Sequence, residues 1–383
     1  MIIALLGMGT IGSGVFEIAN KLEGVTLKKV LEKRFQAEYI TDNIEDILND
    51  QEIELVVETM GGLHPAYEFA KASLEAGKHF VTANKLLVSV YGAELVAIAR
   101  AKGVAFLYGA ACGGGIAYLA NLKIAKEIDR LVSLGGILNG TTNFILDSMQ
   151  SENKDYAEAL KVAQDLGYAE RDPSSDVDGL DTQRKLILAC SVGFDAYIKP
   201  EDIPTAGIAS VLAADVEWAK ANGMALRLCA CAERNAENAI SAYVEPTLVA
   251  ANAPEAAILK NVNYAWYKGE SYGLMSYIGQ GAGKLPTAAN VIRDVQSIAA
   301  GCMYMTSEAC ASITPDNASA VHAYYARIPA GEAFPAEWIS DSSEQNGMQF
   351  IVTKPVSVAA MHAEMAGKKN CFFAGIQGEK QFI

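Results

Sequence analysis

Short apolar runs alternate with amphipathic segments along the first 125 residues of the chain. The runs have the length of buried strands, and the segments repeat their apolar positions at helical spacing. The predicted strands are 2–6, 25–31, 53–57, 79–82 and 104–107, and the predicted helices are 11–22, 44–49, 65–76 and 93–102. Strands that alternate with helices are typical of a parallel sheet covered on both faces. The pattern predicts an α/β domain with a doubly wound parallel sheet of the Rossmann type over residues 1–125.

From about residue 126 the pattern becomes that of an α+β domain. Residues 223–249 alternate apolar and polar positions, as antiparallel strands do. We expect a substrate-binding, catalytic and dimerisation domain over 126–305. The order strand, helix, strand, helix, strand then predicts a small α+β appendage at 318–383.

One uncharged stretch, 103–122, is long enough to cross a bilayer. Its five glycines, three of them consecutive, would destabilise a helix, so we expect a strand, a glycine loop and a helix start instead. No secretory signal precedes the first glycine motif. These observations predict a cytoplasmic protein that does not contact membranes.

The net charge, the cysteines and the histidines exclude some classes of function. The formal net charge of −14 argues against nucleic acid, whose phosphates need basic patches. The seven cysteines are scattered through apolar runs, and we expect reduced core thiols. The four histidines show no metal-binding spacing.

The motif GMGTIG, residues 7–12, follows the first predicted strand and precedes the first helix. In a dinucleotide site the three glycines allow a tight turn, close approach of the pyrophosphate, and close packing of helix on strand. The helix N-terminus then points free N–H groups at the phosphates. We assign cofactor binding to Gly7, Gly9, Thr10, Ile11 and Gly12.

The end of the second strand bears on the choice of cofactor. An acid there suits the ribose hydroxyls of NAD, and a nearby arginine suits the 2′-phosphate of NADP. The chain offers both in Glu32, Lys33 and Arg34. The register is not fixed by the sequence, and the two cations tip our expectation toward NADP.

Two further strand ends carry polar residues. In VVETMGG, residues 56–62, Thr59 and Met60 could border the nicotinamide ribose. In VTANKLLVS, residues 81–89, Lys85 follows a buried strand directly. Because ligands bind at the carboxyl ends of parallel strands, we expect an active-site role for Lys85.

The stretch YAERDPSSDVDGLDTQRKL, residues 168–186, gathers five carboxylates before an apolar helix. It does not fit a calcium loop, because counting from Asp172 places Val177 and Gln183 where Gly and Glu are required. Asp181 lies four residues before Lys185, so the two share one helix face.

At this point the motifs indicate a family. The chain resembles homoserine dehydrogenase over most of residues 1–301, through GMGTIG, TANK, CGGGI, GGILNGTTNFIL, LGYAERDPSSDVDGLDTQRKL and GQGAGKLPTAANVIRD, in the family's order. The resemblance implies NAD(P)-dependent interconversion of L-homoserine and L-aspartate 4-semialdehyde in threonine and methionine biosynthesis. It also implies a homodimer.

The resemblance also implies roles for single residues. Lys185 matches the family's catalytic lysine, and Lys85 a lysine near cofactor and substrate. Glu170, Asp176 and Asp181 match acids of the substrate site. Independently of the resemblance, the position of Asp181 one helical turn before Lys185 predicts that it keeps that lysine charged and oriented. Gly167 and Gly283 match glycines that touch the cofactor. For the substrate carboxylate, the LNGTTN element offers Asn139, Thr141 and Thr142 as donors, with a purely structural turn as the alternative.

Two departures from the family bear on this picture. The family often has an acid where this chain has Gly109, and that acid and loop carbonyls hold a sodium ion. Here the carbonyls of Cys112, Gly114 and Ile116 could still bind a monovalent cation, but the charged ligand is missing. The segment from 318 resembles an ACT-type regulatory domain only loosely.

Two other functions remain open at this stage. One is a different Rossmann-fold oxidoreductase of small molecules, which would not need LNGTTN or the acidic stretch. The other is a non-catalytic NAD(P)-binding sensor, which would not need Lys85 and Lys185.

Overall fold

The computed structural model of the chain describes residues 1–34 and 36–377, so the last six residues of the expected C-terminal appendage lie outside it. The chain divides into two compact units. The first comprises Met1–Ile128, Ile187–Tyr197 and Gly279–Ala311, and the second comprises Asp129–Leu186, Ile198–Ile278 and Ser312–Ile383. This division differs from the expected boundary near 305, because the chain returns to the first unit at Gly279.

Within the described residues, the first unit is built on a parallel sheet with the strand order β3-β2-β1-β4-β5-β6. The strands are β1 (Ile2–Leu6), β2 (Thr26–Leu31), β3 (Ile40–Thr41), β4 (Leu55–Glu58), β5 (His79–Thr82) and β6 (Phe106–Leu107). The strand order reverses between β1 and β4, and ligands bind such sheets beside that reversal. The predicted doubly wound sheet is confirmed.

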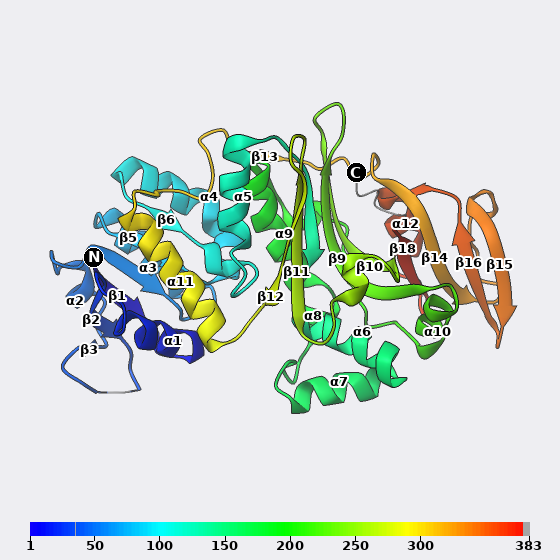
Figure 1. Cartoon of the computed structure of the whole chain (residues 1–383), viewed down its shortest axis with the longest axis horizontal. Coiled ribbons are helices and arrows are strands. Elements are labelled where there is room, and N and C mark those ends of the chain that lie inside the picture. The colour runs from blue at the N-terminus through cyan, green and yellow to red at the C-terminus, as the bar shows by residue number, and fades with distance from the viewer. Residues whose placement is uncertain (35, 378–383) are drawn as a thin grey trace. The chain divides into compact units, whose positions relative to one another are not determined.

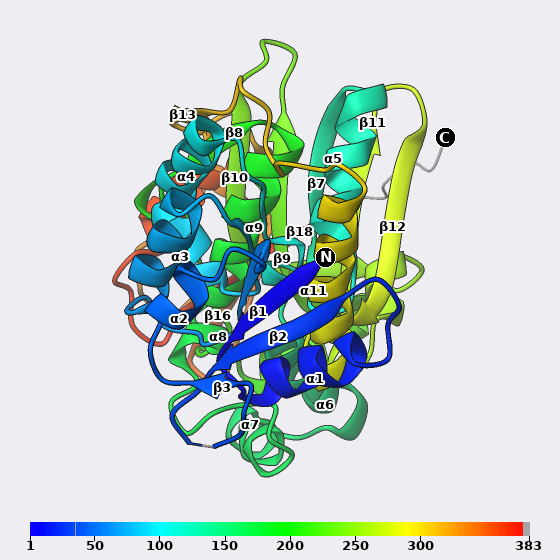
Figure 2. The same cartoon turned by 90° about the vertical axis from the view of Figure 1, so that its left-hand side faces the viewer.

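Helices and a 3-10 turn surround this sheet. They are α1 (Thr10–Ala19), α2 (Glu45–Leu48), α3 (Ala66–Glu75), α4 (Lys85–Lys102), η1 (Gly109–Ala111), α5 (Tyr118–Ile128) and α11 (Lys284–Ala299). Figure 2 shows α11 beside α1, although the two are far apart in the sequence. Gly14 permits this packing, because a Cβ atom there would lie 2.8 Å from the carbonyl oxygen of Lys284.

The second unit is built on a longer, mixed sheet with the order β12-β11-β7-β9-β10-β18-β14-β16-β15, and β17 pairs with β14. Its strands are β7 (Leu131–Ile137), β9 (Met224–Arg234), β10 (Ile240–Ala250), β11 (Val262–Gly269), β12 (Gly273–Gln280), β14 (Val321–Pro329), β15 (Ile339–Gln345), β16 (Met348–Thr353), β17 (Val356–Ser357) and β18 (Phe372–Ile376). The antiparallel pair predicted in 223–249 is confirmed as β9 and β10.

The helices of the second unit position its polar turns. They are α6 (Gly140–Glu152), α7 (Tyr156–Asp165), α8 (Ser174–Val177), α10 (Ala213–Ala221) and α12 (Val358–Met365). Helix α9 (Leu180–Gly193) begins in the second unit and ends in the first, and β8 (Ala196–Ile198) pairs with β13 (Ala311–Ile313).

The C-terminal segment continues the sheet of the second unit. Strand β18 lies parallel to β10, with Thr247 opposite Gly375, and β14, β16 and β15 extend the sheet beyond it (Figure 1). The α+β appendage predicted at 318–383 is therefore part of one larger sheet, because β18 supplies the edge that joins the two groups of strands.

Two elements differ from the sequence prediction. Helix α4 begins at Lys85 and not at residue 93, because the side chain of Asn84 caps it by accepting the N–H of Leu87 at 3.1 Å. The helix expected between residues 328 and 349 is instead strand β15, whose side chains are almost all exposed and so show no apolar alternation.

The uncharged stretch 103–122 forms β6, the 3-10 turn η1 and the start of α5, as predicted. Over the part of the chain that the structure describes, we find no helix with the length and apolar character that a bilayer crossing requires.

Candidate functional site

The turn between β1 and α1 has the geometry of a dinucleotide-binding loop. Gly7 has φ +89°, which favours glycine. A Cβ atom on Gly12 would lie 2.0 Å from the carbonyl oxygen of Gly7, so strand and helix approach closely there. Gly9 caps α1, and a Cβ on it would meet nothing within 4 Å. Thr10 and Ile11 form the first helical residues, so their position fits the predicted phosphate contact.

Glu32, directly after β2, holds this loop. Its Oε2 accepts the N–H of Met8 at 3.0 Å, and its carboxylate forms a forked contact with Arg34 at 2.9 and 2.6 Å. The side-chain hydrogen bond from Arg34 lowers the pKa of Glu32 well below its usual range. The register that the sequence left open thus places the acid on the glycine loop, with its charge shared by Arg34.

Glu58, the last residue of β4, organises the next strand end. It is fully buried and accepts the N–H groups of Met60 and Gly61 at 2.6 and 3.1 Å and the hydroxyl of Thr82 at 2.5 Å. Burial raises the pKa of Glu58 in spite of these bonds. Glu58 was not predicted as a functional residue, although an acid at a strand end shortly before two glycines was a usable signal.

Thr59 and Lys85 stand at neighbouring strand ends of the same sheet, since β4 pairs with β5. The Thr59 hydroxyl donates to the carbonyl of Gly7 at 2.9 Å, so it ties this strand end to the glycine loop. Lys85 is half-buried and opens α4 just after the capping residue Asn84. Both predicted residues therefore lie at the carboxyl edge where such sheets bind ligands.

The two other glycines predicted to contact the cofactor lie next to helix ends. Gly167 follows α7 in the second unit with φ +75°, and a Cβ there would meet nothing within 4 Å. Gly283 precedes α11 in the first unit with φ +122°. Both positions are strained for other residues, which fits close approach of a backbone to a ligand but equally fits an ordinary helix terminus.

In the second unit, the LNGTTN turn is built around Asn139. Its side-chain oxygen caps α6 by accepting the N–H of Thr142 at 2.8 Å. Its side-chain nitrogen donates to Asp176 at 2.7 Å and to Asp181 at 2.9 Å. Asn139 thus fixes two carboxylates that lie 37 and 42 residues further along the chain.

The predicted pair of Asp181 and Lys185 forms at the start of α9. Their Oδ2 and Nζ atoms lie 2.8 Å apart, and both side chains are about nine-tenths buried. Lys185 also donates to the carbonyl of Leu138 at 2.5 Å, and this carbonyl accepts a second bond from Asn263. A buried ammonium is thus held between a carboxylate and a backbone carbonyl, which fixes its orientation.

The other residues predicted to bind the substrate differ in how exposed their side chains are. Glu170 is exposed and Asp176 is half-buried. Thr142 is fully buried, and its hydroxyl donates to the carbonyl of Asn139 at 3.1 Å. This position makes Thr142 part of the capped turn rather than a group open to a ligand. Thr141 is used similarly, because its hydroxyl donates to the carbonyl of Tyr168.

The carbonyl cradle expected for a monovalent cation contains a side chain. The carbonyls of Gly114 and Ile116, and that of Gly109, accept hydrogen bonds from Asn290. The residues present therefore do not fit a cation. Among the described residues, no group of three or more His, Cys, Asp or Glu side chains could hold a metal ion.

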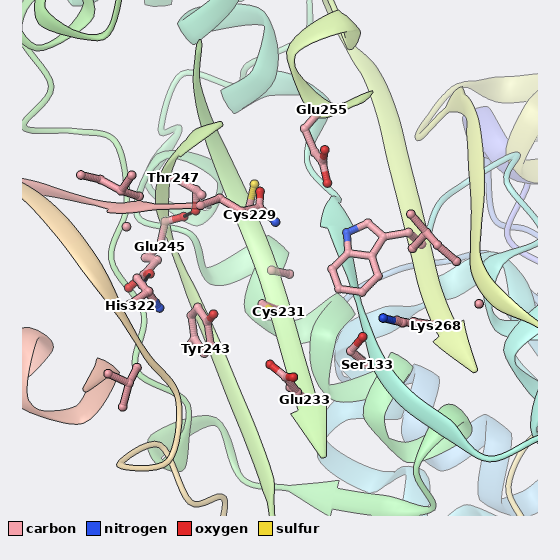
Figure 3. Close-up of a pocket in the computed structure, with 18 of the residues that line it drawn as sticks. Ser133, Cys229, Cys231, Glu233, Tyr243, Glu245, Thr247, Glu255, Lys268 and His322 are labelled. Carbon is pink, nitrogen blue, oxygen red and sulfur yellow. Dashed lines mark hydrogen bonds and ion pairs between the residues drawn. The ribbon is translucent and has the colours of Figure 1, made fainter. Parts of the chain in front are cut away.

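A pocket of about 610 Å³ lies on one face of the second unit's sheet (Figure 3). Its walls come from β7, β9, β10, β11, β12, β14 and β18, and the predicted site residues are not among those lining it. Figure 3 shows Glu245 beside His322 on one side of the pocket and Lys268 on the other.

Comparisons with known proteins agree on one family. The chain matches the family models "Homoserine dehydrogenase" over residues 118–296 and "Homoserine dehydrogenase, NAD binding domain" over 7–109. It is 37% identical to a homoserine dehydrogenase of Bacillus subtilis, over 77% of this chain and 72% of that one. It is 41% identical to one of Synechocystis, with the same coverage. A homoserine dehydrogenase structure from Thiobacillus denitrificans has a TM-score of 0.88 at 29% identity and covers 98% of both chains.

Proposed function

The chain belongs to the homoserine dehydrogenase family, and from this premise we propose how its residues share the reaction. Members are oxidoreductases that act on a hydroxyl group, here interconverting L-homoserine and L-aspartate 4-semialdehyde. The observation that carries our proposal is the buried pair of Lys185 and Asp181, 2.8 Å apart. We assign to Lys185 the proton that the substrate oxygen gains or loses.

Reduction of an aldehyde builds negative charge on its oxygen. A bound nicotinamide cofactor supplies the hydride. The Lys185 ammonium can donate a proton to that oxygen and stabilise the charge before transfer. Asp181 and the Leu138 carbonyl hold the ammonium in one orientation, so little reorganisation is needed when the charge appears.

Two acids predicted for the substrate site suit the substrate's α-ammonium group. Asp176 is half-buried and its position is fixed by Asn139, whereas Glu170 is exposed and able to adjust. Charge-assisted hydrogen bonds from an ammonium to two carboxylates would orient the substrate. In the first unit, Lys85 adds a positive charge at the sheet edge where we place the cofactor with Gly7, Gly9, Thr10, Ile11, Gly12 and Thr59.

A direct assay tests the function. The purified chain is mixed with L-aspartate 4-semialdehyde and NADH or NADPH, and cofactor oxidation is followed by absorbance. The reverse reaction uses L-homoserine and the oxidised cofactors. Cofactor binding without turnover in either direction would contradict the enzyme proposal and favour an NAD(P)-binding sensor.

We propose that the enzyme has a lower KM for NAD than for NADP. The sequence alone favoured NADP, because Lys33 and Arg34 are positively charged. Support comes from Glu32, whose carboxylate lies on the glycine loop. A carboxylate there accepts ribose hydroxyls and repels a 2′-phosphate, and its contact with Arg34 offsets the charge of that arginine.

Glu32→Ser should therefore raise the KM for NAD by about 10- to 100-fold, since it removes hydrogen bonds to a charged group, and should lower the KM for NADP. Arg34→Ser is the matched variant at the same loop and should weaken NADP more than NAD. Steady-state kinetics with both cofactors measure this. A Glu32→Ser enzyme with an unchanged ratio of the two KM values would contradict the proposal.

We propose that a second copy of the chain pairs with the second unit's sheet along its edge strand β12. Edge strand β12 exposes Met275 and Ile278, with 42% and 64% of their surfaces accessible. An open edge with apolar side chains is a ready surface for pairing with another chain. Light scattering at several protein concentrations should give the mass of a dimer, and a constant monomer mass would contradict this.

A further inference from the structure

The glycine-rich loop between β6 and α5 turns backbone carbonyls toward a single side chain. The Nδ2 atom of Asn290, on α11, lies 3.2 Å from the carbonyl oxygen of Gly109, 2.8 Å from that of Gly114 and 3.2 Å from that of Ile116. Asn290 is almost fully buried, with 1% of its surface exposed. Carbonyl oxygens that converge on one point are usual ligands of hard cations. In this chain the amide nitrogen of Asn290 lies where such a cation would bind.

The distances are those of hydrogen bonds. N–H···O bonds span about 2.7–3.2 Å, whereas the oxygen ligands of a calcium ion lie at about 2.3–2.6 Å. The surroundings fix the orientation of the amide, because the flipped form would place its oxygen against three carbonyl oxygens. The side-chain oxygen of Asn290 in turn accepts a bond of 3.1 Å from Arg293. The amide thus acts as the donor that three acceptors share.

The position of the family's charged ligand leaves no room for a side chain. A Cβ atom on Gly109 would lie 2.7 Å from Oδ1 of Asp294. The Oδ2 atom of Asp294 accepts the N–H of Gly109 at 2.6 Å. The three carbonyls therefore already share an amide donor, and residue 109 has no space for an acidic side chain.

The loop that Asn290 holds lies against the turn before α11. Gly115 donates its N–H to the carbonyl of Gln280 at 3.0 Å, and a Cβ atom on Gly114 would lie 2.3 Å from the carbonyl oxygen of Gly281. This turn ends at Gly283, which we assign to the cofactor. Fixing the loop therefore also fixes the turn.

We propose that Asn290 is a positioning residue that takes the place of a monovalent cation, so that this chain holds its glycine loop without a bound ion. This deepens the proposed function, because the family resemblance implies sodium at this loop. Its first readout is thermal unfolding without substrate, so it can fail or succeed independently of turnover.

The test compares sodium chloride, potassium chloride and choline chloride at equal ionic strength. The Tm of the wild-type chain should be the same in all three. Asn290→Ala leaves buried carbonyls without this donor, and its Tm in choline chloride should fall by roughly 5 °C. Sodium should restore part of that loss, because the emptied cradle can then bind the ion. Asn290→Asp should respond to sodium more strongly, since it adds a carboxylate to the cradle.

Gln296→Ala is the matched control, because Gln296 is an exposed side chain on the same helix, and its Tm should not change. A saturable rise of the wild-type Tm with sodium, absent from Asn290→Ala, would mean that an ion binds beside Asn290 and would overturn the proposal. So would an Asn290→Ala chain as stable as wild type in choline chloride. If both Asn290 variants fail to fold, the wild-type Tm still tests the proposal, because the proposal requires that Tm to be the same in sodium, potassium and choline chloride.

Discussion

Lys185→Ala should lower kcat by about 10³-fold or more while leaving NAD(P)H affinity nearly unchanged. The expectation follows from the buried position of the ammonium between Asp181 and the Leu138 carbonyl, where it can protonate the substrate oxygen. General acid catalysis contributes about 10²–10⁴-fold, and preorganised charge stabilisation adds to it. Turnover is measured in both directions, and cofactor binding by the fluorescence of the reduced nicotinamide.

Arg184→Ala is the matched control, since Arg184 precedes Lys185 on the same helix but donates to Ser175 instead. It should keep kcat within a few-fold of wild type. Because Lys185 also pairs with a buried acid, its loss could affect folding, so thermal unfolding is measured for both variants. Parallel losses of turnover, cofactor affinity and Tm in Lys185→Ala would indicate a structural role instead.

The pairing of Asp181 and Lys185 could be predicted because it is local. A spacing of four residues on a helix places two side chains on one face, and the observed 2.8 Å contact between Asp181 and Lys185 is the one that this spacing allows. The strands of the first sheet were predictable for a similar reason, since short buried runs bounded by turns need no knowledge of distant residues. The glycine loop was predictable because the fit of Gly12 against Gly7 depends only on the local chain.

The role of Asn139 could not be predicted in the same way. Its sequence position suggested a donor to the substrate, but its nitrogen joins Asp176 and Asp181, which only folding brings near. Asn290 is a stronger case, because the carbonyls that it contacts lie more than 170 residues earlier in the chain. Contacts of this kind depend on how helices pack, which periodicity does not encode.

The second large effect should come from Glu245, on β10, which is buried at the junction between the middle of the second sheet and its C-terminal strands. Its carboxylate contacts His322 at 2.8 Å, His362 at 2.9 Å and the hydroxyl of Tyr324 at 3.4 Å. Glu245→Leu should lower the free energy of unfolding by about 3–5 kcal/mol at pH 7, because it strips buried polar groups of their shared partner. Urea unfolding monitored by circular dichroism measures the loss.

Acid should reduce the contribution of Glu245. Burial alone would raise the pKa of this carboxyl, but hydrogen bonds from His322 and His362 bring it below its usual range. A carboxyl whose folded pKa is depressed stabilises the fold above its unfolded value of about 4.3 and loses that effect as the pH falls through the folded value. Glu245→Gln keeps the shape and removes the charge. The stability gap between wild type and this variant should therefore be widest above about pH 5 and should shrink in acid.

Glu233→Gln separates this effect from the general response of acidic side chains, because Glu233 also lines the pocket but is exposed on β9. Its stability should follow that of wild type at every pH. If the gap for Glu245→Gln stayed constant from neutral pH into acid, the carboxylate charge would not be the stabilising feature. The hydrogen bonds alone would then join β10 to β14 and α12, and the loss in Glu245→Leu would reflect their removal and not that of a buried ionised group.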